Sequence, residues 1–127
     1  MPVQLNHHIV RVRDKQVAAE YYADVLGLPP AKPFGPFLHL QLANAISLDF
    51  QDVEGEIPGE HYAFLVTEEE WDGIFDRLKA RGTTYYADPF LKRPGEWNTD
   101  DGGRGLYWFD PDGHFLEILT RPYGGLS

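Results

Sequence analysis

A strand followed by a helix occurs twice in this sequence, and this repetition limits the folds open to it. In the first copy, residues 5–13 have the composition of a strand, and Asp14 after them is a good helix N-cap. Apolar residues then recur at helical spacing until Gly27, which is typical of a helix C-terminus. In the second copy, a strand begins at His61 and leads to Thr67, which forms a capping-box pattern with the glutamate three residues later.

The spacing between the two copies is nearly constant. His7 and His61 are 54 residues apart, the two helix N-caps are 53 apart, and the glycines that close the helices are 55 apart. We interpret this agreement as an internal duplication. It divides the chain into a first module of about residues 1–57 and a second of about residues 58–127.

Each helix is followed by segments that alternate in the manner of strands. They are residues 37–42 and 45–50 in the first half, and residues 83–87, 105–109 and 114–119 in the second half. The second half is longer because residues 91–104, rich in Pro, Gly and Asp, form a predicted loop that could cover a pocket. The pattern predicts one α+β domain over residues 1–127, made of two modules of strand, helix and up to three strands.

Charge and composition exclude several classes of partner. With 11 Lys and Arg against 20 Asp and Glu, the net charge of −9 would repel nucleic acids and anionic membranes. The sequence has no cysteine, no secretory leader pattern and no apolar run long enough to span a membrane. We therefore expect a cytoplasmic protein without disulfides.

One acidic residue stands in an otherwise apolar strand and suggests a metal site. Glu117 lies in the segment HFLEIL, and a buried carboxylate needs a cation or hydrogen-bond donors to offset its lost hydration. His7 and His61 begin the duplicated strands. Two histidines and one carboxylate form a set that binds divalent ions and leaves coordination positions open for a substrate. The alternative is a pair of structural histidines and a glutamate that faces solvent.

Longer stretches of the sequence resemble a known superfamily. The segments LNHHIVRVRD, AAEYYADVLGL, HYAFLVT and GLYWFDPDGHFLEIL are similar to the vicinal-oxygen-chelate superfamily of glyoxalases, fosfomycin-resistance transferases, extradiol dioxygenases and bleomycin-resistance proteins. The resemblance covers essentially the whole chain. It implies paired βαβββ modules that form an open, eight-stranded, barrel-like sheet around a metal, often in a homodimer.

The resemblance also implies roles for individual residues. His7, His61 and Glu117 match the family's metal ligands, and the ion would be Fe, Zn, Ni or Mn. His8 is expected on the opposite, helix-facing side of its strand, although a shift of one residue in register would exchange it with His7. Asp49 occupies in the first module the place of Glu117 in the second, which makes it a fourth ligand, a base or a polar residue at a strand end.

Three further residues bear on the site. Tyr107 matches a position that faces the substrate in fosfomycin-type members, and the alternative is core packing. His39 could face the same cavity as a proton carrier, because imidazole titrates near neutral pH. An ordinary strand residue is the alternative interpretation. His114 follows a turn and is expected to be exposed.

These residues predict an enzyme that binds neighbouring oxygens of a small-molecule substrate to a divalent ion, for isomerisation, lyase or epimerase chemistry. Glu117, Asp49 and Tyr107 would take part in catalysis. One alternative is an Fe(II) extradiol-type dioxygenase, and a fosfomycin-type transferase ranks below it. Another alternative is a metal-free protein that sequesters a drug, since 3 Trp, 7 Tyr and 8 Phe with an acidic surface suit a flat cationic ligand.

Overall fold

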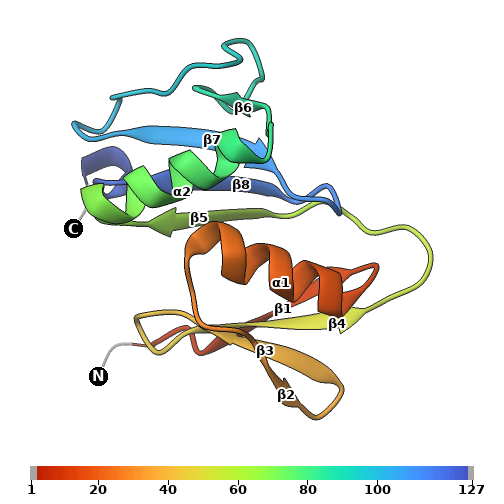
Figure 1. The fold of residues 1–127 in the computed structure, drawn as a ribbon. Helices are drawn as coiled ribbons and strands as arrows, with labels where there is room; N and C mark the ends of the chain where they lie inside the picture. Colours follow the sequence, from red (N-terminus) through yellow and green to blue (C-terminus); the bar gives the residue numbers. More distant parts are fainter. Residues whose placement is uncertain (1–2, 126–127) are drawn as a thin grey trace. The chain divides into compact units, whose positions relative to one another are not determined.

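The computed structural model describes residues 3–125, which fold as two units with a boundary between Ile57 and Pro58. Module 1 contains β1 (His7–Val12), α1 (Lys15–Leu26), β2 (Lys32–Phe34), β3 (Phe37–Gln41) and β4 (Ser47–Asp52). Module 2 contains β5 (His61–Leu65), α2 (Glu68–Ala80), β6 (Tyr85–Tyr86), β7 (Gly105–Phe109), β8 (Phe115–Leu119) and a short 3₁₀ turn, Tyr123–Gly125. Figure 1 shows both modules.

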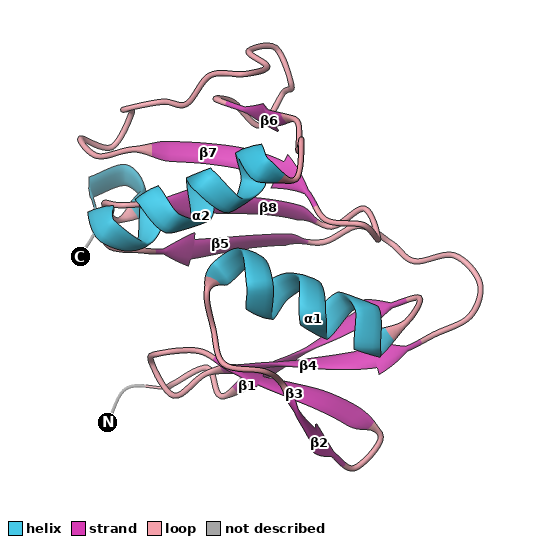
Figure 2. Ribbon diagram, in the orientation of Figure 1, coloured by secondary structure: helices cyan, strands magenta, loops and turns pink. Residues whose placement is uncertain are grey.

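The two modules have the same topology. The strand order is β1-β4-β3-β2 in module 1 and β5-β8-β7-β6 in module 2, and in each sheet the first pair is parallel and the others are antiparallel. Each helix connects the first strand of its module to the later strands and lies along its own sheet (Figure 2). The α+β class with two βαβββ modules is thereby confirmed, with the eight strands arranged as two four-stranded mixed sheets.

The core of each module lies between its helix and its sheet. In module 1, Val10, Val12 and Phe50 are fully buried, as is Tyr22 on the buried side of α1. In module 2, the buried side of α2 consists of Trp71, Ile74 and Leu78, and the sheet contributes these buried residues: Leu106, Trp108, Leu116 and Ile118. Because side chains alternate along a strand, every second residue points to the face of the sheet that the helix does not cover. That face is available to bind a ligand.

The predicted helix ends are confirmed in detail. The Asp14 carboxylate accepts hydrogen bonds from the backbone of residues 16 and 17, and Gly27 has the left-handed conformation (φ 71°) that ends α1. The Thr67 hydroxyl accepts from the Glu70 N–H, and the Glu70 carboxylate accepts in return from the Thr67 N–H. This capping box satisfies two backbone donors that the first turn of α2 would otherwise leave unpaired.

Loss of this cap is expected to destabilise module 2. Replacing Thr67 by alanine removes the acceptor for the Glu70 N–H, and we expect the free energy of unfolding to fall by about 1 kcal/mol. Urea denaturation followed by circular dichroism measures the change. Thr67→Ser is the matched control because it keeps the hydroxyl, and an equal loss in both variants would contradict the role of the cap.

One expectation from the sequence needs correction, and one strand is missed. His114 is expected to be exposed, but it is 1% exposed, since its Nδ1 accepts the Glu60 N–H and its ring packs edge-on against Tyr62 at 5.8 Å. Strand β2 is not predicted, because its three residues, KPF, are all exposed and include a proline. It is an edge strand that pairs only with β3 within the described sheet of module 1.

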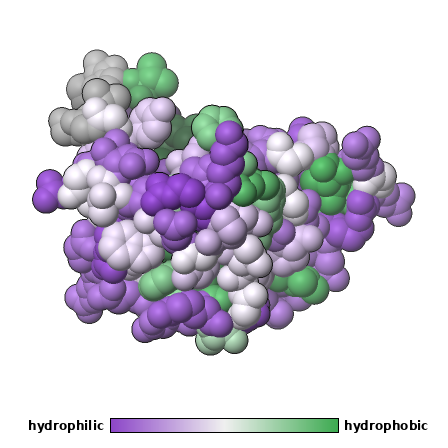
Figure 3. Space-filling view, turned by 90° about the horizontal axis from the view of Figure 1, so that it is seen from above, coloured by the Kyte–Doolittle hydropathy of each residue, from purple (hydrophilic) through white to green (hydrophobic). Residues whose placement is uncertain are grey.

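The surface reflects the composition. Hydrophilic residues predominate on the face drawn in Figure 3, and hydrophobic residues appear there as separate patches. Within residues 3–125, no helix has the length and apolar character needed to cross a bilayer.

Candidate functional site

The candidate site of module 2 lies on the sheet face that α2 leaves uncovered. The register pairs Glu117 on β8 with Ala63 on β5 and with Tyr107 on β7. Alternation then places His61 and Phe115 on the same face as Glu117, whereas Leu116 and Ile118 point toward the helix. The sheet register therefore brings together residues that lie far apart in the sequence.

The hydrogen bonds of His61 determine which of its nitrogens is available. His61 Nδ1 lies 2.9 Å from the backbone carbonyl oxygen of Phe115, which can only accept, so Nδ1 carries the proton and donates. In the neutral imidazole, Nε2 then presents a lone pair. This nitrogen lies 3.1 Å from Glu117 Oε1. Because both atoms are acceptors when Glu117 is ionised, the contact requires a proton or a cation between them.

Burial makes the charged form of Glu117 costly. The side chain is 7% exposed, and this desolvation raises the pKa of Glu117 above the ordinary value of 4.5. The charged form of His61 and the Tyr107 hydroxyl, as hydrogen-bond donors, act in the opposite direction. Desolvation also raises the pKa of Tyr107, and the neighbouring Glu117 carboxylate raises it further. Tyr107 is therefore a neutral phenol that donates to Glu117.

Aromatic rings surround this carboxylate. The rings of Tyr107 and Phe115 stack with centroids 5.4 Å apart, and His61 stacks on Tyr107 at 6.1 Å. Phe109 packs against Phe115 at 4.7 Å and is half exposed. The rings hold the His61 imidazole in place and form a flat apolar surface beside the polar groups.

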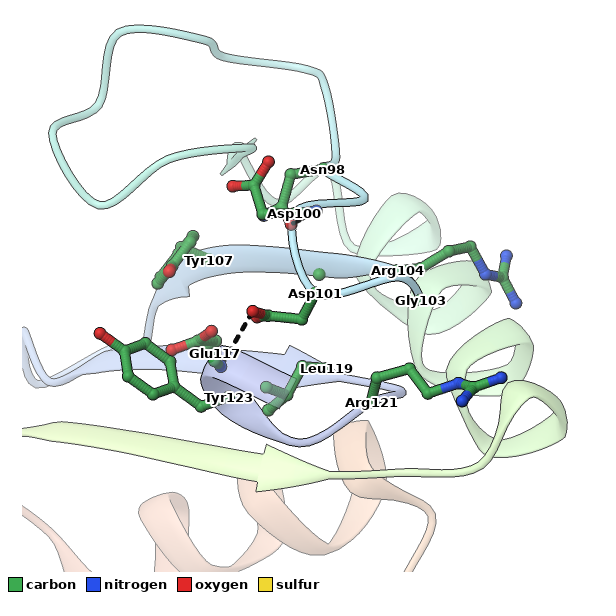
Figure 4. Close-up of a pocket in the computed structure, with 12 residues that line it drawn as sticks. Asn98, Asp100, Asp101, Gly103, Arg104, Tyr107, Glu117, Leu119, Arg121 and Tyr123 are labelled. Atoms are coloured by element: carbon green, nitrogen blue, oxygen red, sulfur yellow. Dashed lines mark hydrogen bonds between the residues drawn. The ribbon is translucent and has the colours of Figure 1, made fainter. Parts of the chain in front are cut away.

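Two cavities meet at Glu117. One has a volume of about 550 Å³ and a largely apolar lining that includes His61, Leu65 and Pro89. The other has a volume of about 250 Å³ and a more polar lining that includes Asp100 and Asp101 (Figure 4). Four residues line both cavities: Tyr107, Glu117, Leu119 and Tyr123. The predicted loop of residues 91–104 thus contributes one side of the smaller cavity.

Arginines near the smaller cavity direct their charges away from Glu117. Figure 4 shows the guanidinium groups of Arg104 and Arg121 pointing away from the carboxylate. Arg104 instead forms ion pairs of 2.9 Å with Glu68 and Asp72 on α2. Burial alone would lower the pKa of Arg104, but these two acidic partners outweigh burial and raise it. The surroundings of Glu117 therefore favour a cation over an anion.

Module 1 carries an equivalent arrangement on its own open face. In the register, Asp49 on β4 pairs with His39 on β3, as Glu117 pairs with Tyr107 in module 2. Asp49 is 5% exposed and accepts from the Ser47 hydroxyl at 3.3 Å. His39 Nδ1 lies 2.8 Å from Asp49 Oδ1. The predicted correspondence of Asp49 and Glu117 is thus reproduced by the strand register.

Both ring nitrogens of His39 have a polar partner. The amide nitrogen of Gln41 donates to the carbonyl oxygens of Leu42 and Ile46, so its oxygen faces His39 Nε2 at 3.2 Å and needs an N–H there. The other ring nitrogen, Nδ1, faces the Asp49 carboxylate. The His39 imidazole and the Asp49 carboxylate are therefore hydrogen-bonded to each other, which is a suitable arrangement for moving a proton to or from a substrate.

The strand β1 presents its two histidines on opposite faces. His7 alternates with Ile9, which pairs with Asp49, and so His7 shares the open face of the sheet. His8 alternates with the buried residues Val10 and Val12 on the helix side. His7 stands two residues before the partner of Asp49, just as His61 stands two residues before the partner of Glu117.

The predicted site residues fall into two groups. Module 2 brings His61, Glu117 and Tyr107 together, and module 1 brings His39 and Asp49 together on the face that also carries His7. Within either module, as far as residues 3–125 are concerned, no three His, Asp or Glu side chains gather as a metal site.

Several residues of the site are not found from the sequence. The Phe115 carbonyl orients His61, Asp101 lines the smaller cavity, and Tyr123 lines both cavities. A backbone carbonyl carries no sequence signal. For Asp101, the available signal is the acidic pair at residues 100 and 101 within a predicted pocket-covering loop.

Comparisons with known proteins identify the family to which the chain belongs. The family model described as the Glyoxalase/Bleomycin resistance protein/Dioxygenase superfamily matches residues 4–118. The solved structures titled "Oxidase ChaP-H1" and "Oxidase ChaP-H2" are 56% and 54% identical, both with a TM-score of 0.95. They cover 98% and 99% of this chain and 100% of their own. The glutathione transferase FosA of Serratia marcescens is 28% identical over 96% of this chain and 92% of its own length. This chain belongs to the glyoxalase, bleomycin-resistance and dioxygenase superfamily.

Proposed function

We propose that the protein is an enzyme that uses one divalent metal ion, held by His7, His61 and Glu117, to act on a small substrate with two neighbouring oxygens. The observation that carries the proposal is the contact between His61 Nε2 and Glu117 Oε1 at 3.1 Å. The hydrogen bond from His61 Nδ1 to the Phe115 carbonyl makes Nε2 a lone-pair donor that faces a buried carboxylate.

This pair fits a metal ion for chemical reasons. Metal-binding histidines commonly donate their second ring N–H to a carbonyl or carboxylate, which fixes the tautomer and the ring orientation. An imidazole nitrogen and a carboxylate oxygen are ligands that Fe, Mn, Ni and Zn accept. His7 stands in module 1 at the position equivalent to His61, which supports it as the third ligand. When bound, such an ion stabilises negative charge on substrate oxygens.

The other site residues would bind the substrate and move protons. Tyr107 stays neutral at physiological pH and can donate a hydrogen bond to a substrate oxygen in place of Glu117. Its stacked ring offers an apolar surface for the rest of the substrate. His39 and Asp49 are hydrogen-bonded to each other and would exchange a proton with the substrate, with Asp49 as the base and His39 as the proton carrier.

Two reaction types are supported by separate observations. Oxygen-dependent oxidation is favoured by the relatives titled as oxidases, which are 54–56% identical over nearly the whole chain. Proton transfer of the isomerase, lyase or epimerase kind is favoured by the hydrogen bond between His39 and Asp49. We place oxidation first, because it is supported by relatives that are 54–56% identical over nearly the whole chain, whereas proton transfer is supported by one side-chain contact. A homodimer is proposed from the family resemblance, and sedimentation would test it.

Metal analysis followed by a substrate screen tests the proposed function. Purified protein is stripped with a chelator and equilibrated anaerobically with Fe²⁺, Mn²⁺, Zn²⁺ or Ni²⁺. About one ion per chain is expected by plasma mass spectrometry. Catechols are then screened for oxygen consumption, and 2-oxoaldehyde adducts for isomerisation. A protein that retains no metal and instead binds a flat cationic drug at micromolar concentration would be a sequestering protein.

Replacing Asp49 by asparagine distinguishes a base from a ligand. If Asp49 accepts a proton from the substrate, Asp49→Asn should lower kcat for the substrate found in the screen by about 10²–10⁴-fold with unchanged metal content. Gln51→Glu changes the charge at the next position on the same face of β4 and leaves Asp49 in place. It therefore shows how kcat responds to a change of charge alone. A loss of bound metal in Asp49→Asn would show a fourth ligand instead, and unchanged kcat would contradict the proton-transfer role.

A further inference from the structure

Tyr123 occupies an unusual position at the end of module 2. It follows β8 in the short 3₁₀ turn and lines both cavities that meet at Glu117. Its side chain is nevertheless 73% exposed. An aromatic ring beside a buried carboxylate, with most of its surface uncovered, is available to a bound molecule. Figure 4 shows the Tyr123 ring next to Glu117.

A hydrogen bond from the following residue fixes the backbone at this position. The Gly124 N–H donates to Asp101 Oδ1 at 2.9 Å, and both residues line the smaller cavity, which Figure 4 shows. Gly124 has φ of 63°, a left-handed conformation that favours glycine. The turn that carries Tyr123 is therefore tied to the loop before β7.

The loop that supplies Asp101 is itself held firmly. The backbone of Asn98 pairs with that of Gly105 in both directions, at 2.8 and 2.9 Å. The Arg104 N–H donates to the Thr120 hydroxyl at 2.8 Å, and the Thr120 N–H donates to the Arg104 carbonyl. Asp101 thus projects from a segment anchored to β7 and to the end of β8, which makes it a fixed acceptor for Gly124.

We propose that Tyr123 is a substrate-contacting residue and that Asp101 is its positioning residue. This inference rests on the proposed function, since the substrate must be bound by its oxygens near Glu117. The Tyr123 ring then packs against the apolar part of the substrate that extends beyond those oxygens. The hydrogen bond from Gly124 to Asp101 keeps the ring at the junction of the two cavities.

Two chelating probes of different size test this role without a turnover assay. 4-Nitrocatechol carries two neighbouring oxygens on an aromatic ring and changes colour when chelated, whereas oxalate has two oxygens and no apolar part. Co²⁺-loaded protein is titrated with each, oxalate by competition. We expect Tyr123→Ala to weaken 4-nitrocatechol binding by about tenfold and to leave oxalate and Co²⁺ binding unchanged.

The positioning role is tested with a pair of matched variants. Asp101→Ala removes the acceptor and should weaken 4-nitrocatechol about as much as Tyr123→Ala does, while Asp101→Asn keeps an acceptor oxygen and should bind nearly as the wild type. Adding Asp101→Ala to Tyr123→Ala should cause little further loss. Hydrogen exchange at the Gly124 amide, which needs no metal, should accelerate in Asp101→Ala and stay slow in Asp101→Asn.

The outcomes separate this inference from the proposed function. A wild-type protein that binds no Co²⁺ would overturn the proposed function and the inference with it. If the wild type binds Co²⁺ and both probes, equal 4-nitrocatechol affinity in wild type and Tyr123→Ala overturns the inference alone. The inference also fails if Tyr123→Ala weakens oxalate and 4-nitrocatechol equally, because a contact beyond the chelated oxygens affects only the larger probe.

Discussion

Replacing His61 by alanine is expected to lower the affinity for Co²⁺ or Mn²⁺ by at least about 100-fold, because the variant loses the lone pair that faces Glu117. The fold should remain intact, since His61 begins β5 with an exposed side chain. Isothermal titration calorimetry on chelator-treated protein measures the affinity, and circular dichroism the fold. Full metal occupancy in His61→Ala would contradict the proposed ligand set.

The two neighbouring histidines of β1 provide a matched control for the third ligand. His7 lies on the open face of its sheet and His8 on the helix face, yet both alanine variants remove one imidazole from the same strand. We expect His7→Ala to weaken metal binding strongly and His8→Ala to leave it nearly unchanged. Equal effects of the two substitutions would mean that neither is a ligand, whereas the reverse order would assign the site to His8.

Replacing Glu117 by glutamine is expected to have opposite effects on metal binding and on stability. The variant should lose metal affinity at least about 100-fold, because a neutral amide oxygen is a far weaker ligand than a carboxylate. In the metal-free protein at pH 8, however, its thermal midpoint should exceed that of the wild type by several degrees. The new amide removes a buried charge and can donate an N–H to His61 Nε2.

The sign of the pH dependence follows from the direction of the pKa shift. Burial raises the pKa of Glu117 in the folded protein above its ordinary value of 4.5 in the unfolded chain. Its contribution to stability is therefore fully present below the unfolded pKa and is lost as the pH rises through the folded pKa. Glutamine does not titrate, so the difference in midpoint between variant and wild type should be near zero at pH 4 and grow toward neutral pH.

Differential scanning calorimetry in the presence of a chelator measures both midpoints across this range. Glu60→Gln, at a half-buried position just before β5, is a control for removing one negative charge from the same module. A wild type that is more stable than Glu117→Gln at pH 8 without metal would mean that the carboxylate has a structural role. Such a result would contradict the argument that the buried Glu117 carboxylate needs a bound cation.

Much of the fold could be predicted because its determinants are local. Asp14, the Thr67 capping box and Gly27 act within a few residues along the chain, so their effect can be recognised in the sequence. Glu117 is the one acidic residue in the apolar segment of β8, which predicts its burial, and the structure confirms it. Strand β2 could not be predicted because a short edge strand with a proline has no alternating pattern.

The sequence by itself determined the two modules, their elements and the unusual buried carboxylate. Tertiary structure alone decided which groups touch, because contacts across a sheet depend on strand register and not on spacing along the chain. Register joined His61 to the Phe115 carbonyl and Glu117, and so fixed the proton on Nδ1. Tertiary packing also decided the burial of His114, which the sequence predicts to be exposed after a turn. In the fold its ring accepts the backbone N–H of Glu60, a residue 54 positions earlier.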